Sequence, residues 1–119
     1  MILADTSIWV DHLRSGDALL EELLNTAEVL CHPFVIGEIA MGNLRRREFI
    51  LEDMRNLPRA TVAGDEEVLA FIERRRLFGL GLGYVDAHLL AAVQLTLGAK
   101  LWTRDRRLDS AARGLRLAD

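Results

Sequence analysis

Short apolar runs alternate with longer amphipathic segments along most of the chain, and no other feature restricts its fold as strongly. The run Ile2–Asp5, for example, places three apolar residues before the polar sequence D-T-S. Such a run is too short for a helix and is typical of a central parallel strand, which is buried on both faces. The same pattern predicts strands over Glu28–Cys31, Ala60–Val62 and Lys100–Thr103, and Leu115–Leu117 could form an edge strand.

Segments with apolar residues at helical spacing separate these runs. A strand followed by a helix, repeated about four times, predicts an α/β fold: a short parallel sheet of four to five strands with helices on both faces. The chain has no internal repeat, low-complexity tract or linker, so we expect residues 1–119 to form a single domain. The predicted helices are Ser7–Arg14, Asp17–Asn25, Pro33–Met41, Arg45–Leu57, Asp65 to about Phe78, Tyr84–Leu97 and Arg106–Arg113.

One acidic residue, Asp86, falls where a carboxylate is costly. It precedes Leu89 by three residues, so in a helix the two side chains lie on the same face. That face is expected to pack into the core, and a buried carboxylate without a partner costs on the order of several kcal/mol unless its pKa changes. The apolar residues that define the face are Leu89, Leu90, Val93 and Leu97.

Three further acids are expected at the same end of the sheet. Asp5 ends the first predicted strand, and Asp105 follows the strand Lys100–Thr103. The carboxyl ends of parallel strands share one edge, and ligands bind at that edge in open α/β sheets. Glu38 lies on the helix that starts from this edge after the second strand, and the helix of Asp86 could start nearby. The sequence therefore predicts that four carboxylates meet at one rim.

Four carboxylates at one rim need protons or a cation. At a separation of about 4 Å, two like charges repel by about 4 kcal/mol at an effective dielectric constant near 20. No His or Cys has metal-ligand spacing, which argues against zinc and favours Mg²⁺ or Mn²⁺, a type of site that suits phosphodiester hydrolysis. Simpler alternatives stay open: Asp5 and Asp105 could cap helices, Asp86 could interact with a helix dipole, and Glu38 could be a surface residue.

The cations are almost all arginine. The net charge of −3 argues against a general polyanion binder, yet fourteen arginines accompany a single lysine. Arginine binds phosphate through a bidentate fork and stacks on bases, so its clusters could contact nucleic acid; solvated helix faces in an arginine-rich composition are the alternative. The clusters are Arg45–Arg47, Arg74–Arg76 and the group Arg104, Arg106 and Arg107.

Other features point to an ordinary cytoplasmic protein. Cys31 is alone, so no internal disulfide can form, and we expect it to be buried. No apolar run approaches the roughly 18–20 residues of a membrane span, and the N-terminus lacks the early positive charge of a signal peptide. Trp9, Trp102 and His88 are expected to be mainly structural residues.

Four motifs together resemble a known family. They are I-L-A-D-T-S with Asp5, H-P-F-V-I-G-E with Glu38, G-Y-V-D-A-H-L-L-A-A with Asp86 and L-W-T-R-D-R-R-L with Asp105. In order and over essentially the whole chain, they resemble PIN-domain ribonucleases, specifically the VapC-type toxins of bacterial type II toxin–antitoxin systems. The resemblance implies a PIN fold, Mg²⁺- or Mn²⁺-dependent endoribonuclease activity, a homodimer, and inhibition by a cognate VapB-like antitoxin.

The resemblance also implies roles for single residues. Thr6 matches the small hydroxyl residue often found beside the first acid, and Thr103 matches the one two positions before the last acid. Arg104, Arg106 and Arg107 flank the expected site and could steer an RNA backbone. The residues that match the family's catalytic and metal-binding acidic quartet are Asp5, Glu38, Asp86 and Asp105.

Two further expectations concern the surfaces that bind a protein partner and the alternative functions of the chain. Leu19–Leu24 and the apolar sides of the helix Arg45–Leu57 are candidate antitoxin or dimer surfaces, although most of these side chains could belong to the core. The alternative function is a non-catalytic PIN-fold module that binds RNA or a partner without cleavage. A haloacid-dehalogenase-like phosphatase is disfavoured, because Ser7 stands where its second aspartate would be.

Overall fold

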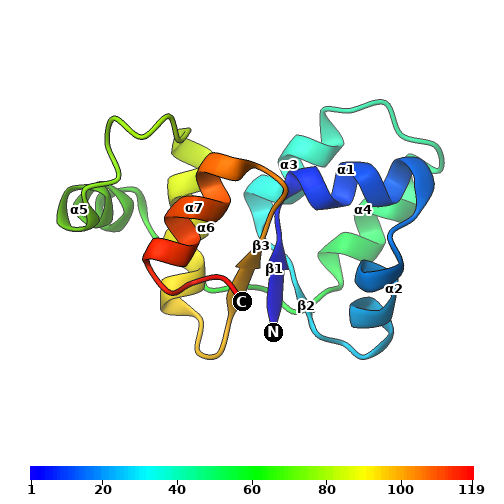
Figure 1. Ribbon diagram of the computed structural model, residues 1–119. Coiled ribbons are helices and arrows are strands. Elements are labelled where there is room, and N and C mark those ends of the chain that lie inside the picture. Colours follow the sequence, from blue (N-terminus) through cyan, green and yellow to red (C-terminus); the bar gives the residue numbers. More distant parts are fainter.

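A three-stranded parallel sheet with the order β2-β1-β3 forms the centre of the computed structural model, which describes residues 1–119 (Figure 1). The middle strand β1 (Ile2–Ala4) pairs with β2 (Val29–Leu30) and with β3 (Lys100–Trp102). Leu3 and Ala4 of β1 have no exposed surface, as expected for a strand covered on both faces. The α/β class with a parallel sheet is therefore confirmed.

The predicted count of four to five strands is wrong, because the two outer segments make only single parallel bridges. Arg59 pairs with Cys31, and Ala118 pairs with Leu101. On the first edge, the N–H of Thr61 leaves the ladder and donates to the hydroxyl of Thr96 at 2.8 Å, so no strand forms over 60–62. On the other edge, residues 115–117 form the turn that follows the last helix, where the N–H of residue 117 donates to the carbonyl of residue 112 at 2.7 Å.

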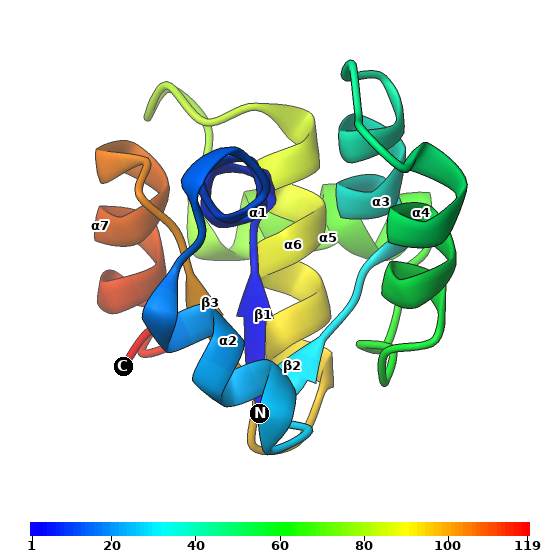
Figure 2. The same ribbon diagram turned by 90° about the vertical axis from the view of Figure 1, so that its right-hand side faces the viewer.

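Seven helices surround the sheet, and each lies where the apolar spacing predicts one. Helices α1 and α2 cover one face and α6 the other, while α7 lies beside β3, and α3 and α4 lie beyond β2 (Figure 2). None of the seven combines the length and apolarity that a membrane crossing requires. Their bounds are α1 (Thr6–Ser15), α2 (Ala18–Asn25), α3 (Pro33–Ala40), α4 (Arg47–Arg55), α5 (Asp65–Arg75), α6 (Tyr84–Leu95) and α7 (Arg106–Gly114).

Helix α6 is the most buried helix and packs between β3 and α5. Its residues 87–93 are all buried, which confirms the predicted core positions Leu89, Leu90 and Val93. The prediction for Leu97 is wrong, because this side chain is fully exposed. The helix ends at residue 95, since Thr96 adopts an extended conformation and turns its hydroxyl back to the carbonyl of residue 92.

Candidate active site

Asp5 lies at the carboxyl end of β1 and is the N-cap of α1. It is only 6% exposed, and both of its carboxylate oxygens accept hydrogen bonds. Oδ1 accepts from the N–H of Ile8 at 3.3 Å and from the hydroxyl of Ser7, while Oδ2 accepts from the hydroxyl of Thr103. The cap does not compete with a role in a site, because capping engages one of the two oxygens.

Asp105 occupies the equivalent position after β3 and is the N-cap of α7. Its Oδ1 accepts from the N–H groups of Arg107 and Leu108, at 2.9 and 3.1 Å, and its Oδ2 has no partner in the protein. The hydroxyl of Thr103 accepts from the N–H of Asp105 at 3.0 Å while it donates to Asp5. Thr103 therefore connects the carboxylate of Asp5 to the backbone of Asp105, at the ends of two neighbouring strands.

Glu38 reaches the site from α3, on the opposite side of α1 from β3. Its Oε1 accepts a hydrogen bond from the hydroxyl of Thr6, the residue after Asp5, and its Oε2 has no partner. Glu38 is exposed, so its side chain is held by this one bond rather than by packing. The bond ties α3 to the start of α1, two helices that contact each other along their length.

Asp86 lies in the first turn of α6 and is half-buried. Its Oδ2 accepts from the N–H of Gly83 at 2.9 Å, which closes a capping box, and its Oδ1 has no partner. Desolvation by burial raises the pKa of Asp86 above its usual 3.8, and the carboxylates of Asp105, Asp5 and Glu38 raise it further, against the opposing effect of the Gly83 hydrogen bond. Three acids from separate segments therefore act electrostatically on Asp86.

These four acids, called here the acidic cluster, have the chemistry of a divalent-cation site. None of them makes an ion pair with an arginine or lysine, so nothing in the chain neutralises their charge. Oxygen donors of this kind suit Mg²⁺ or Mn²⁺. No group of three Asp, Glu, His or Cys side chains lies close enough together to hold one ion. A cation shared by the acidic cluster therefore requires some of these side chains to rotate. Glu38 and Asp105 are exposed and have room to rotate.

The three arginines next to the site differ in their surroundings. Arg104 turns away from the acidic cluster: its guanidinium contacts Asp11 at 3.3 Å and Asp17 at 2.6 Å and lies over the ring of Trp102. Arg106 is exposed and makes no ion pair. Arg107 is also exposed, and its side chain passes so close to Gly81 that a Cβ atom there would lie 2.7 Å from the guanidinium.

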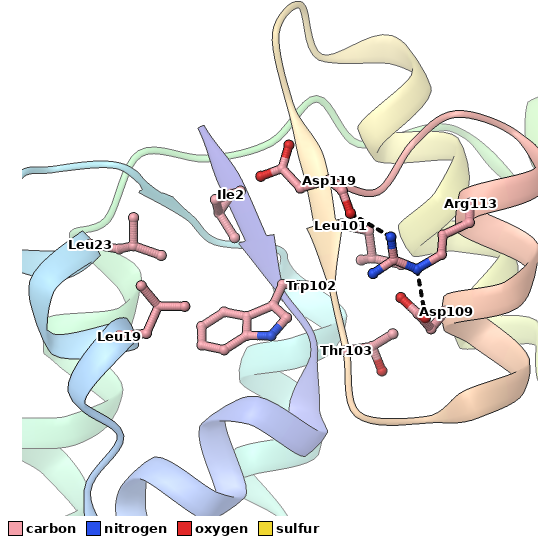
Figure 3. Close-up of a pocket in the computed structure, with 9 residues that line it drawn as sticks. All are labelled: Ile2, Leu19, Leu23, Leu101, Trp102, Thr103, Asp109, Arg113 and Asp119. Carbon is pink, nitrogen blue, oxygen red and sulfur yellow. Dashed lines mark hydrogen bonds and ion pairs between the residues drawn. The ribbon is translucent and has the colours of Figure 1, made fainter.

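Asp109, one turn after Asp105, does not join the acidic cluster. It faces a cavity of about 400 Å³ between α2, α7 and the sheet, where it pairs with Arg113 at 2.8 Å (Figure 3). Leu19 and Leu23 of α2 line the opposite wall of this cavity, facing Trp102. The carboxylate of Asp109 is also not among those that raise the pKa of Asp86.

Ser7 is the site residue that sequence reasoning missed. Its hydroxyl donates to Asp5 and accepts from the N–H of Arg104 at 3.0 Å, so it holds the buried acid and the chain after β3 together. The sequence did contain a signal for this role, because Ser7 carries a hydroxyl two residues after the N-cap aspartate Asp5. His88 is buried against the rings of Phe34 and Tyr84, in line with the expected structural role.

Comparison with known proteins places this arrangement in a family. The family model of the PIN domain matches residues 2–114. The chain is 52% identical to ribonuclease VapC32 of Mycobacterium tuberculosis over 111 residues, which cover 93% of this chain and 90% of that protein. The same values hold for ribonuclease VapC32 from a second strain of that organism. The chain therefore belongs to the PIN-domain family and, within it, to the VapC group.

Proposed function

We propose that this protein is a divalent-metal-dependent endoribonuclease and the toxin of a toxin–antitoxin pair. The observation that carries the proposal is the acidic cluster, in which the carboxylates of three separate segments act on that of Asp86 and no arginine or lysine neutralises them. The kinship with a protein named ribonuclease supports the same reaction. The alternative of a non-catalytic binding module is less well supported, because it does not explain why four carboxylates are kept in the acidic cluster.

Asp5, Glu38, Asp86 and Asp105 would hold Mg²⁺ or Mn²⁺ through their carboxylate oxygens. Three of these residues keep one oxygen free of any protein partner, and that oxygen is available to a ligand. When bound, such a cation neutralises charge on an RNA phosphate and makes water a better nucleophile.

The surrounding residues orient these ligands. The hydroxyls of Ser7 and Thr103 hold Asp5, and the hydroxyl of Thr6 holds Glu38. Backbone N–H groups hold Asp86 and Asp105 at the starts of their helices. Hydrogen bonds to ligating carboxylates reduce the number of orientations that they sample and so favour ordered metal binding.

A VapB-like antitoxin is the expected protein partner. A cavity of about 370 Å³ between α1, α2 and α4 is the strongest candidate for its docking surface, because Trp9, Leu13, Leu24 and Leu57 give it apolar walls. Two of these residues, Leu24 and Leu57, belong to the surfaces that the sequence singled out. We further propose that the protein acts in the cytoplasm as a homodimer.

Cleavage of total cellular RNA by the antitoxin-free protein tests the proposed activity. With Mg²⁺ or Mn²⁺ we expect discrete products that disappear with EDTA and with Asp86→Asn. The Asn side chain can still accept the Gly83 hydrogen bond, so this variant removes charge while it preserves the capping box. Glu66→Gln is the matched control, since it removes an exposed first-turn carboxylate from α5. Metal-independent RNA binding by a wild-type protein that never cleaves would instead favour the binding module.

A further inference from the structure

A groove of about 410 Å³ adjoins the acidic cluster at Glu38. It is lined by α1, α3, α4 and the segment between α3 and α4, which lie together on the same side of the sheet (Figures 1 and 2). Glu38 lines this groove and is also a member of the acidic cluster, so the groove and the cluster share this side chain. The volume lies within the roughly 300–1,000 Å³ of typical small-ligand pockets.

The groove carries two arginines that have no partner in the protein. Arg14 and Arg45 are exposed and make neither an ion pair nor a side-chain hydrogen bond. The neighbouring Arg47 is different, because its guanidinium donates to the backbone carbonyls of Ala40 and Gly42 and so holds the segment that forms one wall. Two unpaired guanidinium groups on an ordered wall make this part of the surface attractive to an anion.

The remaining lining of the groove is largely aliphatic. Leu13, Ile39, Leu44 and Ile50 contribute side chains to it. A nucleotide combines the two properties that this surface complements: a phosphate that arginine binds with a bidentate fork, and a base that is apolar on its faces. An acidic protein segment would use the arginines but would leave the aliphatic surface without a matching group.

We propose that this groove binds a nucleotide of the RNA strand adjacent to the cleaved bond, with Arg14 and Arg45 contacting backbone phosphates. The inference rests on the proposed ribonuclease function, which places a scissile phosphate at the acidic cluster. A strand that leaves the acidic cluster past Glu38 would reach the groove, because Glu38 belongs to both. The groove then contributes substrate affinity, whereas the acids contribute the chemistry.

The test compares the double variant Arg14→Gln/Arg45→Gln with Arg55→Gln/Arg116→Gln. The control pair removes the same charge from the last turn of α4 and from the turn after α7, where both arginines are exposed and make no ion pair. Binding of a fluorescein-labelled, single-stranded RNA of randomised sequence is measured in the Asp86→Asn background with Mg²⁺, so that the probe stays intact. Cleavage is measured separately with the two arginine pairs in the wild-type background.

We expect the groove variant to weaken RNA binding about tenfold. The slope of log K against log[salt] should also become shallower, by about 0.7 for each RNA phosphate that an arginine no longer neutralises. In the cleavage assay KM rises while kcat stays close to that of the control pair, as expected when substrate and transition state are bound more weakly to the same extent. Thermal unfolding of both double variants checks that each is folded.

Equal RNA affinity of the groove variant and the control pair would overturn the inference. Unchanged RNA affinity together with weaker binding of the cognate antitoxin would also overturn it, and would assign the groove to a protein partner. If the wild-type protein cleaves no RNA but its RNA binding still depends on Arg14 and Arg45, the proposed nuclease activity fails while the assignment of the groove stands.

Discussion

The carboxylate of Asp86 is half-buried on α6 and has three other carboxylates as electrostatic neighbours. Burial first, and then these neighbours, raise its pKa above the 3.8 of an unperturbed aspartate. A folded-state pKa above that of the unfolded chain means that the native state binds the proton more tightly. The free energy of unfolding therefore falls as the pH rises through this range, and the ionised carboxylate destabilises the native protein at neutral pH.

Asp86→Asn should accordingly stabilise the metal-free protein. We expect the free energy of unfolding in EDTA at pH 7 to rise by about 1 kcal/mol, the usual gain when a strained functional group is replaced. Urea unfolding followed by circular dichroism measures this change. Glu66→Gln, which removes an exposed carboxylate, should leave stability almost unchanged. A destabilised Asp86→Asn protein would show that the acidic cluster is not under electrostatic strain.

The sequence could predict which acids belong together, but not how each is held. Asp5 and Asp105 follow from the rule that parallel strands end at one edge, and both also turn out to be helix caps. Glu38 depends on the packing of α3 against α1, which no local pattern reveals. Ser7 was missed because a hydroxyl after a cap is common and its second contact, with the N–H of Arg104, is distant in sequence.

His32, at the start of helix α3, makes the stability of the protein depend on pH. It is fully buried, it is the N-cap of α3, and its Nδ1 accepts the N–H of Phe34 at 3.0 Å. Burial, with smaller contributions from His88 and Arg59, lowers the pKa of His32 from 6.5 to about 4. Between these two values the unfolded chain binds a proton that the native state does not. Stability is therefore fully present above about pH 6.5 and decreases as the pH falls toward 4.

Replacing His32 with Asn should reduce this pH dependence. Asn is a good N-cap residue and does not titrate, so it keeps the hydrogen bond to the start of α3. Between pH 7 and pH 5 we expect the wild-type protein to lose about 2 kcal/mol more unfolding free energy than His32→Asn. Urea unfolding of both proteins at the two pH values measures the difference. Equal losses would mean that His32 is protonated in the native state.

The turn after α2 contains an alanine in a left-handed conformation. Ala27 has φ 57° and is exposed. A residue with a Cβ atom is strained in this region, whereas glycine adopts it freely. We expect Ala27→Gly to raise the free energy of unfolding by about 0.5–1 kcal/mol. Ala70→Gly, at an exposed position inside α5, should lower it by a similar amount. Denaturant midpoints that move in the same direction for both variants would contradict the assignment of strain.

All seven helices were predictable, whereas the width of the sheet was not. Helical spacing persists over two or three turns, so each helix leaves a repeated signal in the sequence. The edge segments at Arg59 and Ala118 contribute one bridging residue each, and a run of three residues cannot distinguish a strand from a single bridge. The end of α6 was misplaced because it depends on Thr96, whose hydroxyl is shared with Thr61 from a distant segment.

At the scale of the whole molecule, the partners of the arginines depend on distant parts of the chain and do not follow from neighbouring residues. Arg104, Arg106 and Arg107 look equivalent in the sequence, yet Arg104 is held by Asp11 and Asp17 from the other end of the chain. Its guanidinium thus links the segment before α7 to α1 and to the N-cap of α2. The unpaired arginines Arg14 and Arg45 belong instead to the groove beside Glu38.

A divalent cation should couple the acidic cluster to the stability of the entire fold. Its proposed ligands come from the ends of β1 and β3 and from α3 and α6, so an ion that binds only the native arrangement would oppose global unfolding. At a hundred times its dissociation constant, such an ion stabilises the folded state by about 2.7 kcal/mol. We therefore expect the melting temperature of the wild-type protein to rise by several degrees with Mg²⁺ or Mn²⁺, compared with EDTA at equal ionic strength.

The same cation should have a much smaller effect on Asp86→Asn, so that the two proteins exchange their order of stability. Without metal the variant is the more stable, because it lacks one of four repelling charges; with metal the wild type is the more stable, because it keeps all four ligands. Differential scanning calorimetry of both proteins, with Glu66→Gln alongside, measures this crossing. Equal metal-induced shifts in all three would mean that the ion binds elsewhere on the surface. A shift confined to the wild type and Glu66→Gln ties the cation to the cluster, because only there does losing the charge of Asp86 remove a ligand.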